Sequence, residues 1–459
     1  MEHAIRNVAN IETSSLLRNG LNHDMWREII HDIVVKGVHK AMNRPDRILR
    51  SVLFGLKALC ILFVLLEAIP SQATTYYVAT SGSDSNPGTS DRPWRNPQKC
   101  ANSPIKAGDT CIVRSGTYTA PSGKFIIVNV GSSSPSGTAS QPITIKSEKP
   151  LGAVLVLPNV NISTNANSAF WVSKPYYVIE GFDMTGGTAS GSSIDFIAII
   201  GTRGATGLVI RSNSIHHIAR SVCSNSVYGF DGIFLGGTAN ALIERNRLYA
   251  IGRRRNGESG CSTNKFMQDH GIYINGATNL TIRRNVIYDT NRGFPINIKS
   301  AGVTVDGVNI YHNTISGKSP TGSPPGQIAM SSTLRNLKIR NNVFHDPPKG
   351  YVFWWSDLSV SGLLIDYNLS NSTNSTLLNS YAKPSSGITY TSNITGTNPA
   401  FINSSSYDFR LTSSSPAINR GTSSGVPTVP DGRPDMAAYE YSLQNTISSP
   451  LTPTGVKAQ

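Results

Sequence analysis

The segment LTIRRNVIYDT, residues 280–290, places Asn285 between two short runs in which apolar and polar residues alternate. The same pattern, with an asparagine in the same place, recurs in LVIRSNSIHHI (208–218), ALIERNRLYAI (241–251), VNIYHNTISGK (308–318), LKIRNNVFHDP (337–347) and LLIDYNLS (363–370). Alternation with a period of two predicts strands, and Gly, Asn and Pro mark the turns between them. The segment is therefore one copy of a β-repeat.

A second short apolar stretch lies between successive repeats: GIFL from Gly232, GIYI from Gly271, PINI from Pro295 and QIAM from Gln327. Short strands with no helix between them predict an all-β parallel solenoid. Its rungs would stack about 4.8 Å apart, with equivalent apolar side chains in an interior ladder. We expect the repeated asparagines to hydrogen-bond along the axis. We also expect each to adopt the left-handed backbone of a sharp corner, which Asn tolerates.

The solenoid is predicted to cover residues 74–441. Less regular rungs begin near Pro142, Ala153 and Tyr176, so the coil extends toward the N-terminus. Residues 74–118 would form the opening cap, with a short helix at 97–103 plugging the open end, because an unplugged end exposes core and an unpaired strand edge. Residues 442–459 are predicted to be a flexible tail.

The N-terminal part has the features of a targeting segment. An apolar run at 51–70 follows the basic stretch 43–50 and precedes Ser71-Gln72-Ala73, which has small residues where a signal peptidase requires them. We therefore predict a signal peptide or membrane anchor at 42–73, preceded by an upstream extension at 1–41. This predicts a secreted, periplasmic or extracellular protein whose only membrane contact is this segment.

Cysteine usage and charge agree with export. Cysteines 100, 111, 223 and 261 remain beyond the signal, and although they allow three pairings, proximity favours Cys100–Cys111 and Cys223–Cys261. The chain carries a net charge of +14, and the nine basic and seven acidic residues of 1–73 leave +12 for the remainder. Such a field attracts polyanions. Outside the cytoplasm, an acidic polysaccharide is a more plausible partner than nucleic acid.

The opening YYVATSGSDSNPGT…KAGDTCIVRSGTY and the ending DFRLTSSSPAINRG…AAYEY resemble those of secreted right-handed parallel β-helix proteins of the pectate-lyase-like superfamily. The resemblance covers most of residues 74–441 and implies a single-stranded right-handed parallel β-helix. It says little about the catalytic activity, because the same fold occurs in lyases, epimerases and hydrolases. The stretch VYGFD (227–231) is also similar to the YGFDPH-type motif of mannuronan C5-epimerases. However, Gly232 and Ile233 stand where that family has Pro and its catalytic His.

The densest group of polar residues lies between 228 and 299. Aligning YGFDGIFL with QDHGIYI places Asp231 and His270 in one column, one rung apart. We expect the carboxylate to raise the pKa of the imidazole and to select its tautomer. Since Ile272 and Ile274 would point inward, Tyr273 would point outward, and Asn297 and Lys299 would follow on the same face one rung later.

Elimination in a uronate polymer requires a neutralised carboxylate, a base for the proton beside it, and an acid for the leaving oxygen. The predicted catalytic residues are His270 or Tyr273 as base and acid, Arg284 and Lys299 on the carboxylate, and Asp231 beside the imidazole. The predicted substrate-binding residues are Arg283, Arg292, Asn297, Trp354 and Trp355. Adjacent tryptophans in a strand face opposite ways, so one of the last two would be exposed for sugar stacking.

Each of these residues also has a structural interpretation. Asp231 and His270 could bond the backbone at a corner, Tyr273 could be an ordinary surface side chain, and the tryptophans could pack under a loop. No cofactor is evident, and calcium is possible without being indicated. The sequence therefore favours a monomeric polysaccharide lyase that cleaves an acidic glycan by β-elimination. The alternatives are a uronate C5-epimerase and a non-catalytic glycan-binding β-helix.

Overall fold

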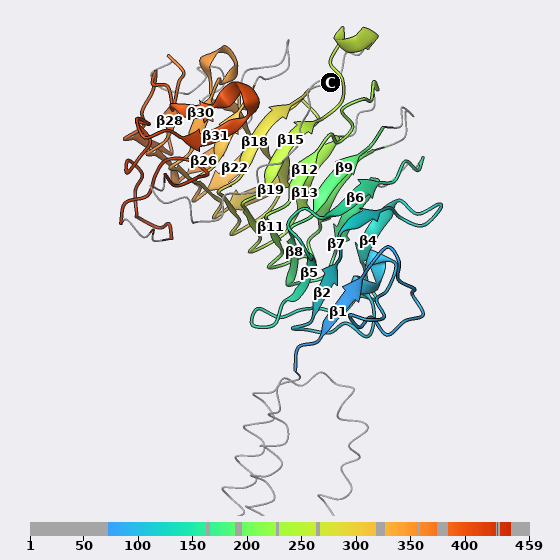
Figure 1. Ribbon diagram of the computed structural model, residues 1–459. Coiled ribbons are helices and arrows are strands. Elements are labelled where there is room, and N and C mark those ends of the chain that lie inside the picture. Colours follow the sequence, from blue (N-terminus) through green and yellow to red (C-terminus); the bar gives the residue numbers. More distant parts are fainter. Residues whose placement is uncertain are drawn as a thin grey trace, which may run out of the picture. The chain divides into compact units, whose positions relative to one another are not determined.

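The chain winds through three long parallel sheets, and each full turn of the coil adds one strand to each sheet (Figure 1). The computed structural model describes residues 72–441 apart from 162–165, 189–194, 226–228, 263–266, 318–325, 357–358, 374–383, 428 and 430–431. Throughout this described part the helices are short 3-10 turns, and none is an α-helix. The predictions for residues 1–41, for 42–71 of the signal or anchor, and for the tail at 442–459 lie outside the described residues.

Sheet A consists of β1 (Thr75–Val78), β2 (Thr110–Val113), β5 (Ile143–Ser147), β8 (Tyr177–Glu180), β11 (Val209–Arg211), β14 (Leu242–Glu244), β17 (Thr281–Arg283), β20 (Asn309–Tyr311), β23 (Lys338–Arg340), β27 (Leu363–Asp366) and β29 (Ile388–Thr391). Sheet B consists of β3 (Gly116–Tyr118), β6 (Ala153–Leu157), β9 (Asp183–Gly186), β12 (Ser214–His216), β15 (Arg247–Ile251), β18 (Val286–Thr290), β21 (Thr314–Ser316), β24 (Val343–His345) and β28 (Leu369–Ser370).

Sheet C consists of β4 (Ile126–Val130), β7 (Ser168–Val172), β10 (Ile197–Gly201), β13 (Asp231–Gly236), β16 (Ile272–Asn275), β19 (Ile296–Asp306), β22 (Ile328–Arg335) and β25 (Phe353–Trp355), with β26 (Ser359–Ser361) also paired to β22. The chain passes from sheet C to sheet A, then to sheet B, and returns to sheet C one rung further along. The predicted parallel β-helix is therefore confirmed.

The interior of the coil is a set of apolar ladders. On sheet C, one ladder runs through residues in register that are fully buried: Ile199, Ile233, Ile272, Ile296, Ile328 and Phe353. Because side chains alternate across a strand, the residues that immediately precede and follow each ladder residue on its strand face outward. Register therefore decides which side chains of sheet C can meet a ligand.

The repeated asparagines form a continuous buried ladder at the corner between sheets A and B. The Asn285 side-chain oxygen accepts hydrogen bonds from the backbone N–H of Asn246 at 2.9 Å and from its side-chain amide at 3.0 Å. The Asn285 amide in turn donates to the backbone carbonyl of Ile243 and to the side-chain oxygen of Asn313. The same bonds join all six predicted positions and a seventh, Asn393. The predicted stacking is confirmed.

The prediction that these asparagines adopt the left-handed backbone conformation is wrong. Positive φ occurs one residue earlier, at Ser212, Arg245, Arg284, His312, Asn341 and Tyr367. The preceding residue makes the sharp bend, and the asparagine satisfies the backbone groups that the bend leaves without strand partners. The repeat therefore uses Asn for its amide and not for its tolerance of the left-handed region.

Replacing Asn285 by Ala should lower the free energy of unfolding by about 2–3 kcal/mol, because the backbone N–H of Asn246 and the carbonyl of Ile243 would each lose a partner while buried. Urea unfolding would measure the loss. The matched variant is Asn393→Ala at the last, partly exposed position, where water can replace the amide, and about 1 kcal/mol is expected. Equal losses at the two positions would contradict this account of the ladder.

The first rung is capped as predicted, by a 3-10 helix, η1 (Pro97–Ala101), which packs against β4. The Gln98 side chain pairs with the backbone of Asn129, donating to its carbonyl at 3.0 Å and accepting from its N–H at 2.7 Å. Since β4 is the end strand of sheet C, this amide occupies part of the edge that would otherwise be unpaired. The predicted Cys100–Cys111 disulfide ties η1 to β2.

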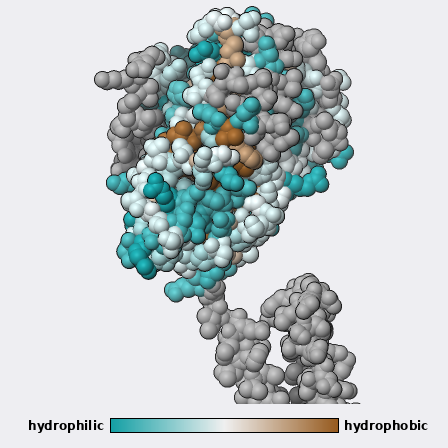
Figure 2. All heavy atoms as spheres, turned by 90° about the vertical axis from the view of Figure 1, so that its right-hand side faces the viewer, coloured by the Kyte–Doolittle hydropathy of each residue, from teal (hydrophilic) through white to brown (hydrophobic). Residues whose placement is uncertain are grey.

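The C-terminal part folds back against the outside of sheet B. An antiparallel hairpin, β30 (Phe401–Asn403) and β31 (Asp408–Leu411), packs Phe409 against Tyr288. Figure 2 shows one face of the molecule, on which apolar residues gather in a patch among residues of intermediate and hydrophilic character. No helix in the described part of the chain has the length and apolar character needed to cross a membrane.

Candidate functional site

One outward-facing column of sheet C combines aromatic and polar side chains. It runs in register through Trp171, Ile200, Phe234, Tyr273, Asn297, Ala329 and Trp354. Tyr273 faces outward because Ile272 and Ile274 on either side of it are fully buried, as predicted. Lys299 lies two residues beyond Asn297 on the same strand and is exposed. The predicted grouping of Tyr273, Asn297 and Lys299 on one face is therefore confirmed.

Aromatic rings continue along this face from rung to rung. The ring centroids of Phe234 and Tyr273 are 5.2 Å apart, as are those of Tyr273 and His270. His270 then stacks on Phe294 at 6.0 Å, and Phe294 stacks on Trp354 at 5.6 Å. Phe234, Tyr273 and Trp354 are only partly buried, so they offer apolar surface to a ligand.

The two tryptophans of β25 face opposite ways, as expected. Trp354 lies on the outward column and is partly exposed, whereas Trp355 is fully buried in the core. The prediction that Trp355 binds substrate is therefore wrong. Trp354 keeps its predicted position as an exposed aromatic side chain.

His270 is buried, and both of its ring nitrogens are engaged. The backbone N–H of Phe294 donates to Nδ1 at 3.1 Å, and the side-chain amide of Asn297 lies 2.9 Å from Nε2. Burial and the nearby Lys299 lower the pKa of His270 to about 3. A neutral imidazole carries one proton, and because Nδ1 accepts from Phe294, that proton is on Nε2. The atom of Asn297 that faces Nε2 is the amide nitrogen Nδ2, so Nε2–H gains an acceptor only when the amide turns its oxygen to this position. The prediction that the Asp231 carboxylate raises the pKa of His270 is therefore wrong.

Asp231 lies in the same column as His270, one rung away, but their side chains do not pair. Its carboxylate accepts a 2.8 Å hydrogen bond from the backbone N–H of His270. Burial, together with the carboxylate of Asp269, raises the pKa of Asp231 well above its usual value. The structural interpretation, a corner residue that bonds the backbone, describes Asp231 correctly.

Tyr273 is the half-buried acid at the centre of the column. Burial and the carboxylate of Asp231 raise the pKa of its phenol above the usual value, so the phenol is protonated at neutral pH. Its neighbours in register are Phe234 on one side and Asn297 on the other. The partly exposed phenol and the exposed Lys299 side chain thus lie on this part of sheet C together with the Asn297 amide, which is 7% exposed.

The predicted arginines do not join this group. Arg283 lies on sheet A, where it pairs with Glu244 at 2.6 Å and donates to the Tyr311 hydroxyl. Arg284 lies at the corner between sheets A and B and pairs with Glu440 at 3.1 Å. These residues follow Tyr273 closely in sequence, but the chain has by then turned onto other sheets. Neither lies on the outward face of sheet C, so the predicted place of Arg284 on the substrate carboxylate and the predicted substrate-binding role of Arg283 do not fit these positions.

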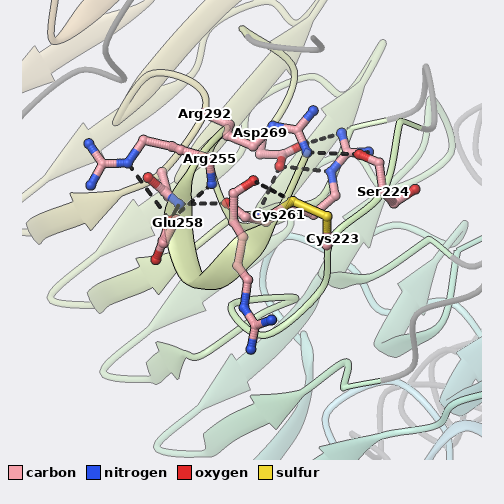
Figure 3. Close-up of a disulfide and its surroundings, with 10 residues drawn as sticks. Cys223, Ser224, Arg255, Glu258, Cys261, Asp269 and Arg292 are labelled. Atoms are coloured by element: carbon pink, nitrogen blue, oxygen red, sulfur yellow. Dashed lines mark hydrogen bonds and ion pairs between the residues drawn. A yellow bond between two sulfur atoms is a disulfide. The ribbon is translucent and has the colours of Figure 1, made fainter. Parts of the chain in front are cut away.

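Arg292 is buried behind the face. Its guanidinium donates to the backbone carbonyl of Ser224 at 2.9 Å, as Figure 3 shows. Burial and the nearby Arg253 lower the pKa of Arg292 to about 10. The prediction that Arg292 binds substrate at the surface does not fit this position.

A buried ion pair that the sequence did not reveal supports the site from behind. Arg253 and Asp269 are both fully buried and lie 2.7 Å apart, and Arg253 also lies over the Phe230 ring at 4.1 Å. The Asp269 carboxylate accepts hydrogen bonds from the backbone N–H groups of Phe230 and Arg253. It therefore joins the segments that lead into β13 and β16. Nothing in the sequence pattern distinguishes this pair from other Arg and Asp residues in loops.

The predicted Cys223–Cys261 disulfide joins the two loops around this ion pair (Figure 3). Two disulfides indicate an oxidising, extracytoplasmic compartment. Tyr228 of the VYGFD stretch lies outside the described residues, while Phe230 is fully buried. Within the part of the chain that is described, no group of three or more His, Cys, Asp or Glu side chains is arranged to hold a metal ion.

A family model described as right-handed β-helix region matches residues 180–422, which is more than half of the chain. The chain belongs to the right-handed β-helix family. The predicted superfamily fold of this β-helix protein is thereby confirmed. No curated protein sequence matches it.

Solved structures with a similar fold include carbohydrate enzymes of several kinds. The β-helix protein is 16% identical to a pectate lyase, with a TM-score of 0.48 over 81% of this chain and 97% of that chain. It is 17% identical to a rhamnogalacturonan lyase, with a TM-score of 0.43 over 72% and 91%. It is 13% identical to a lacto-N-biosidase from Eubacterium ramulus, with a TM-score of 0.44 over 70% and 68%. These likenesses concern the fold alone.

Proposed function

We propose that this protein is a secreted polysaccharide lyase that cleaves an acidic, uronate-containing glycan by β-elimination on the outer face of sheet C. The observation that carries the proposal is the grouping of Tyr273, Asn297 and Lys299 within a row of partly exposed aromatic rings. A phenol, an amide and an ammonium group are the groups that this reaction needs. The signal at 42–73 would export the protein, which would act as a monomer.

The binding part of the proposal rests on shape and charge. Parallel strands about 4.8 Å apart present equivalent positions along the axis, so successive sugars of a polymer can meet successive rungs. Sugar rings would pack on Phe234, Tyr273 and Trp354, whose faces are partly exposed. The excess of basic residues beyond residue 73 would attract the polyanion to the surface.

In the proposed reaction, Lys299 and the Asn297 amide bind the uronate carboxylate and stabilise the charge that develops beside it. Ionised Tyr273 removes the proton from C5, the C5–H electrons form the C4=C5 double bond, and the C4–O bond breaks. The Tyr273 phenol then returns the proton to the leaving oxygen, so the enzyme is regenerated. His270 is a positioning residue here, because its Nε2 contacts the Asn297 amide at 2.9 Å and so fixes the orientation of that amide beside the ligand.

The test is to incubate the purified protein with alginate, pectate and glycosaminoglycans and to follow near-ultraviolet absorbance, which rises when an unsaturated uronate forms. A lyase is expected to produce this rise on at least one polymer. A uronate C5-epimerase would change the sugar NMR spectrum without new absorbance, and a glycan-binding protein would retain the polymer unchanged. Either of those results would overturn the proposed reaction, and absence of binding to every acidic polymer would overturn the proposed substrate class.

A further inference from the structure

The part of sheet C on the N-terminal side of Tyr273 takes no part in the proposed proton transfer, and beyond Phe234 the proposed function gives it no role. Its outward column contains Trp171 on β7, Ile200 on β10 and Phe234 on β13, in register with Tyr273. Trp171 and Phe234 are partly exposed, whereas Ile200 between them is 3% exposed. Two aromatic side chains two rungs apart are thus accessible beside the reaction centre.

Arg203 lies at the edge of this column, in the turn after β10. The next rung has two consecutive glycines, Gly236 and Gly237, at the corresponding place. A Cβ on Gly237 would lie 3.5 Å from Nε of Arg203, and a Cβ on Gly236 would lie 3.0 Å from the ring of Phe234. The Arg203 side chain and the Phe234 ring therefore lie over neighbouring glycines of one rung. A side chain at Gly236 would crowd the Phe234 ring, whereas a Cβ at Gly237 would make an ordinary contact with Arg203.

Among the described residues, no acidic side chain pairs with the Arg203 guanidinium. It is exposed, and no ion pair or side-chain hydrogen bond joins it to another described residue. Other arginines of the coil are neutralised across rungs, as Arg211 is by Glu180 and Arg340 is by Asp366. A free guanidinium beside an exposed aromatic ring can bind a sugar carboxylate through two parallel hydrogen bonds while the sugar ring packs on the aromatic face.

We propose that Arg203, Phe234 and Trp171 form a uronate-binding subsite next to the reaction centre. Arg203 binds the carboxylate of a uronate unit that lies on Phe234, and Trp171 contacts the chain further toward the cap. This inference rests on the proposed function, because it assumes that the same glycan passes Tyr273 about one rung, or 4.8 Å, away. Arg203 contributes to binding and takes no part in proton transfer.

The experiment compares Arg203→Ala, Arg203→Lys and the wild-type protein in affinity electrophoresis with the acidic polymer that the wild type binds, and in steady-state kinetics. Arg203→Ala should raise Kd and KM about tenfold and leave kcat unchanged, as expected for loss of hydrogen bonds to a charged group. Arg203→Lys should recover only part of the affinity, because a lysine cannot make the paired contact. Phe234→Ala should weaken binding in the same assay.

The control is Arg245→Ala, which removes an equally exposed positive charge at the corner between sheets A and B. It should leave Kd within a factor of about two, since a single charge far from the site adds little at physiological salt. If Arg203→Ala and Arg245→Ala bind equally well, the subsite is wrong even though the proposed function stands. If the wild type binds no acidic polymer, both are wrong. Unchanged urea unfolding of Arg203→Ala would show that the loss is local.

Discussion

Replacing Tyr273 by Phe should lower kcat about 100-fold or more on whichever acidic polymer the protein degrades, while Kd changes little. The substitution removes only the phenolic oxygen, and general acid–base groups contribute about 10²–10⁴-fold to such reactions. The ring that packs against Phe234 and His270 remains in place. The readout is the initial rate of near-ultraviolet absorbance.

The pH profile provides an independent check on this residue. Because burial and Asp231 raise the pKa of Tyr273, its ionised form becomes more abundant through the alkaline range, and kcat should rise with pH there. His270, with a pKa of about 3, remains neutral across the same range and should impose no step near neutrality.

The matched control is Tyr407→Phe, at an exposed tyrosine that stacks on Tyr288 over sheet B. It should keep full activity. A Tyr273→Phe protein that retains wild-type kcat would remove Tyr273 from the reaction. A step in kcat with an apparent pKa near 6.5 would instead point to a titrating histidine.

Replacing Asp269 by Ala should lower the free energy of unfolding by about 3–5 kcal/mol, because the Arg253 guanidinium would stay buried without its carboxylate. The backbone N–H groups of Phe230 and Arg253 would also lose their acceptor. Urea unfolding measures the change, and binding of the acidic polymer should weaken together with stability, because Asp269 joins the segments leading into β13 and β16.

Glu180→Ala is the control for this prediction. Glu180 pairs with Arg211 on the neighbouring strand of sheet A, and both side chains are about one-third exposed. Such a pair contributes about 1 kcal/mol or less. A loss at Asp269 no larger than the loss at Glu180 would show that the buried ion pair does not hold the site together.

Several features of the fold follow from local rules that one sequence reveals. The alternation around Ile272 and Ile274 predicts that Tyr273 faces outward, because a strand has only two faces. The six repeated asparagines predict a stacked column, because each copy occupies the same place in its turn of the coil. Trp354 and Trp355 are adjacent, so opposite orientations follow, but the identity of the buried one depends on the register of β25 with β22.

The site was predicted less completely, because neighbours in sequence separate at each corner. Arg283 and Arg284 lie only ten and eleven residues after Tyr273, yet the chain has left sheet C by then, and they bind Glu244 and Glu440 instead. His270 and Asp231 do share a column. A shared column does not specify which side chains pair, however. The Asp231 carboxylate accepts a hydrogen bond from the backbone N–H of His270 and does not pair with its imidazole.

The coil and the face of sheet C on which Tyr273, Asn297 and Lys299 lie follow from the sequence alone, since periodicity repeats the same environment at each turn. For the disulfides, proximity in sequence favoured the correct pairing among three. The charge states of the buried groups, in contrast, follow from how the chain packs. The pKa of His270 and the burial of Arg253, Asp269 and Arg292 depend on loops that pack from different rungs. Desolvation is a property of that packing, and no local pattern encodes it.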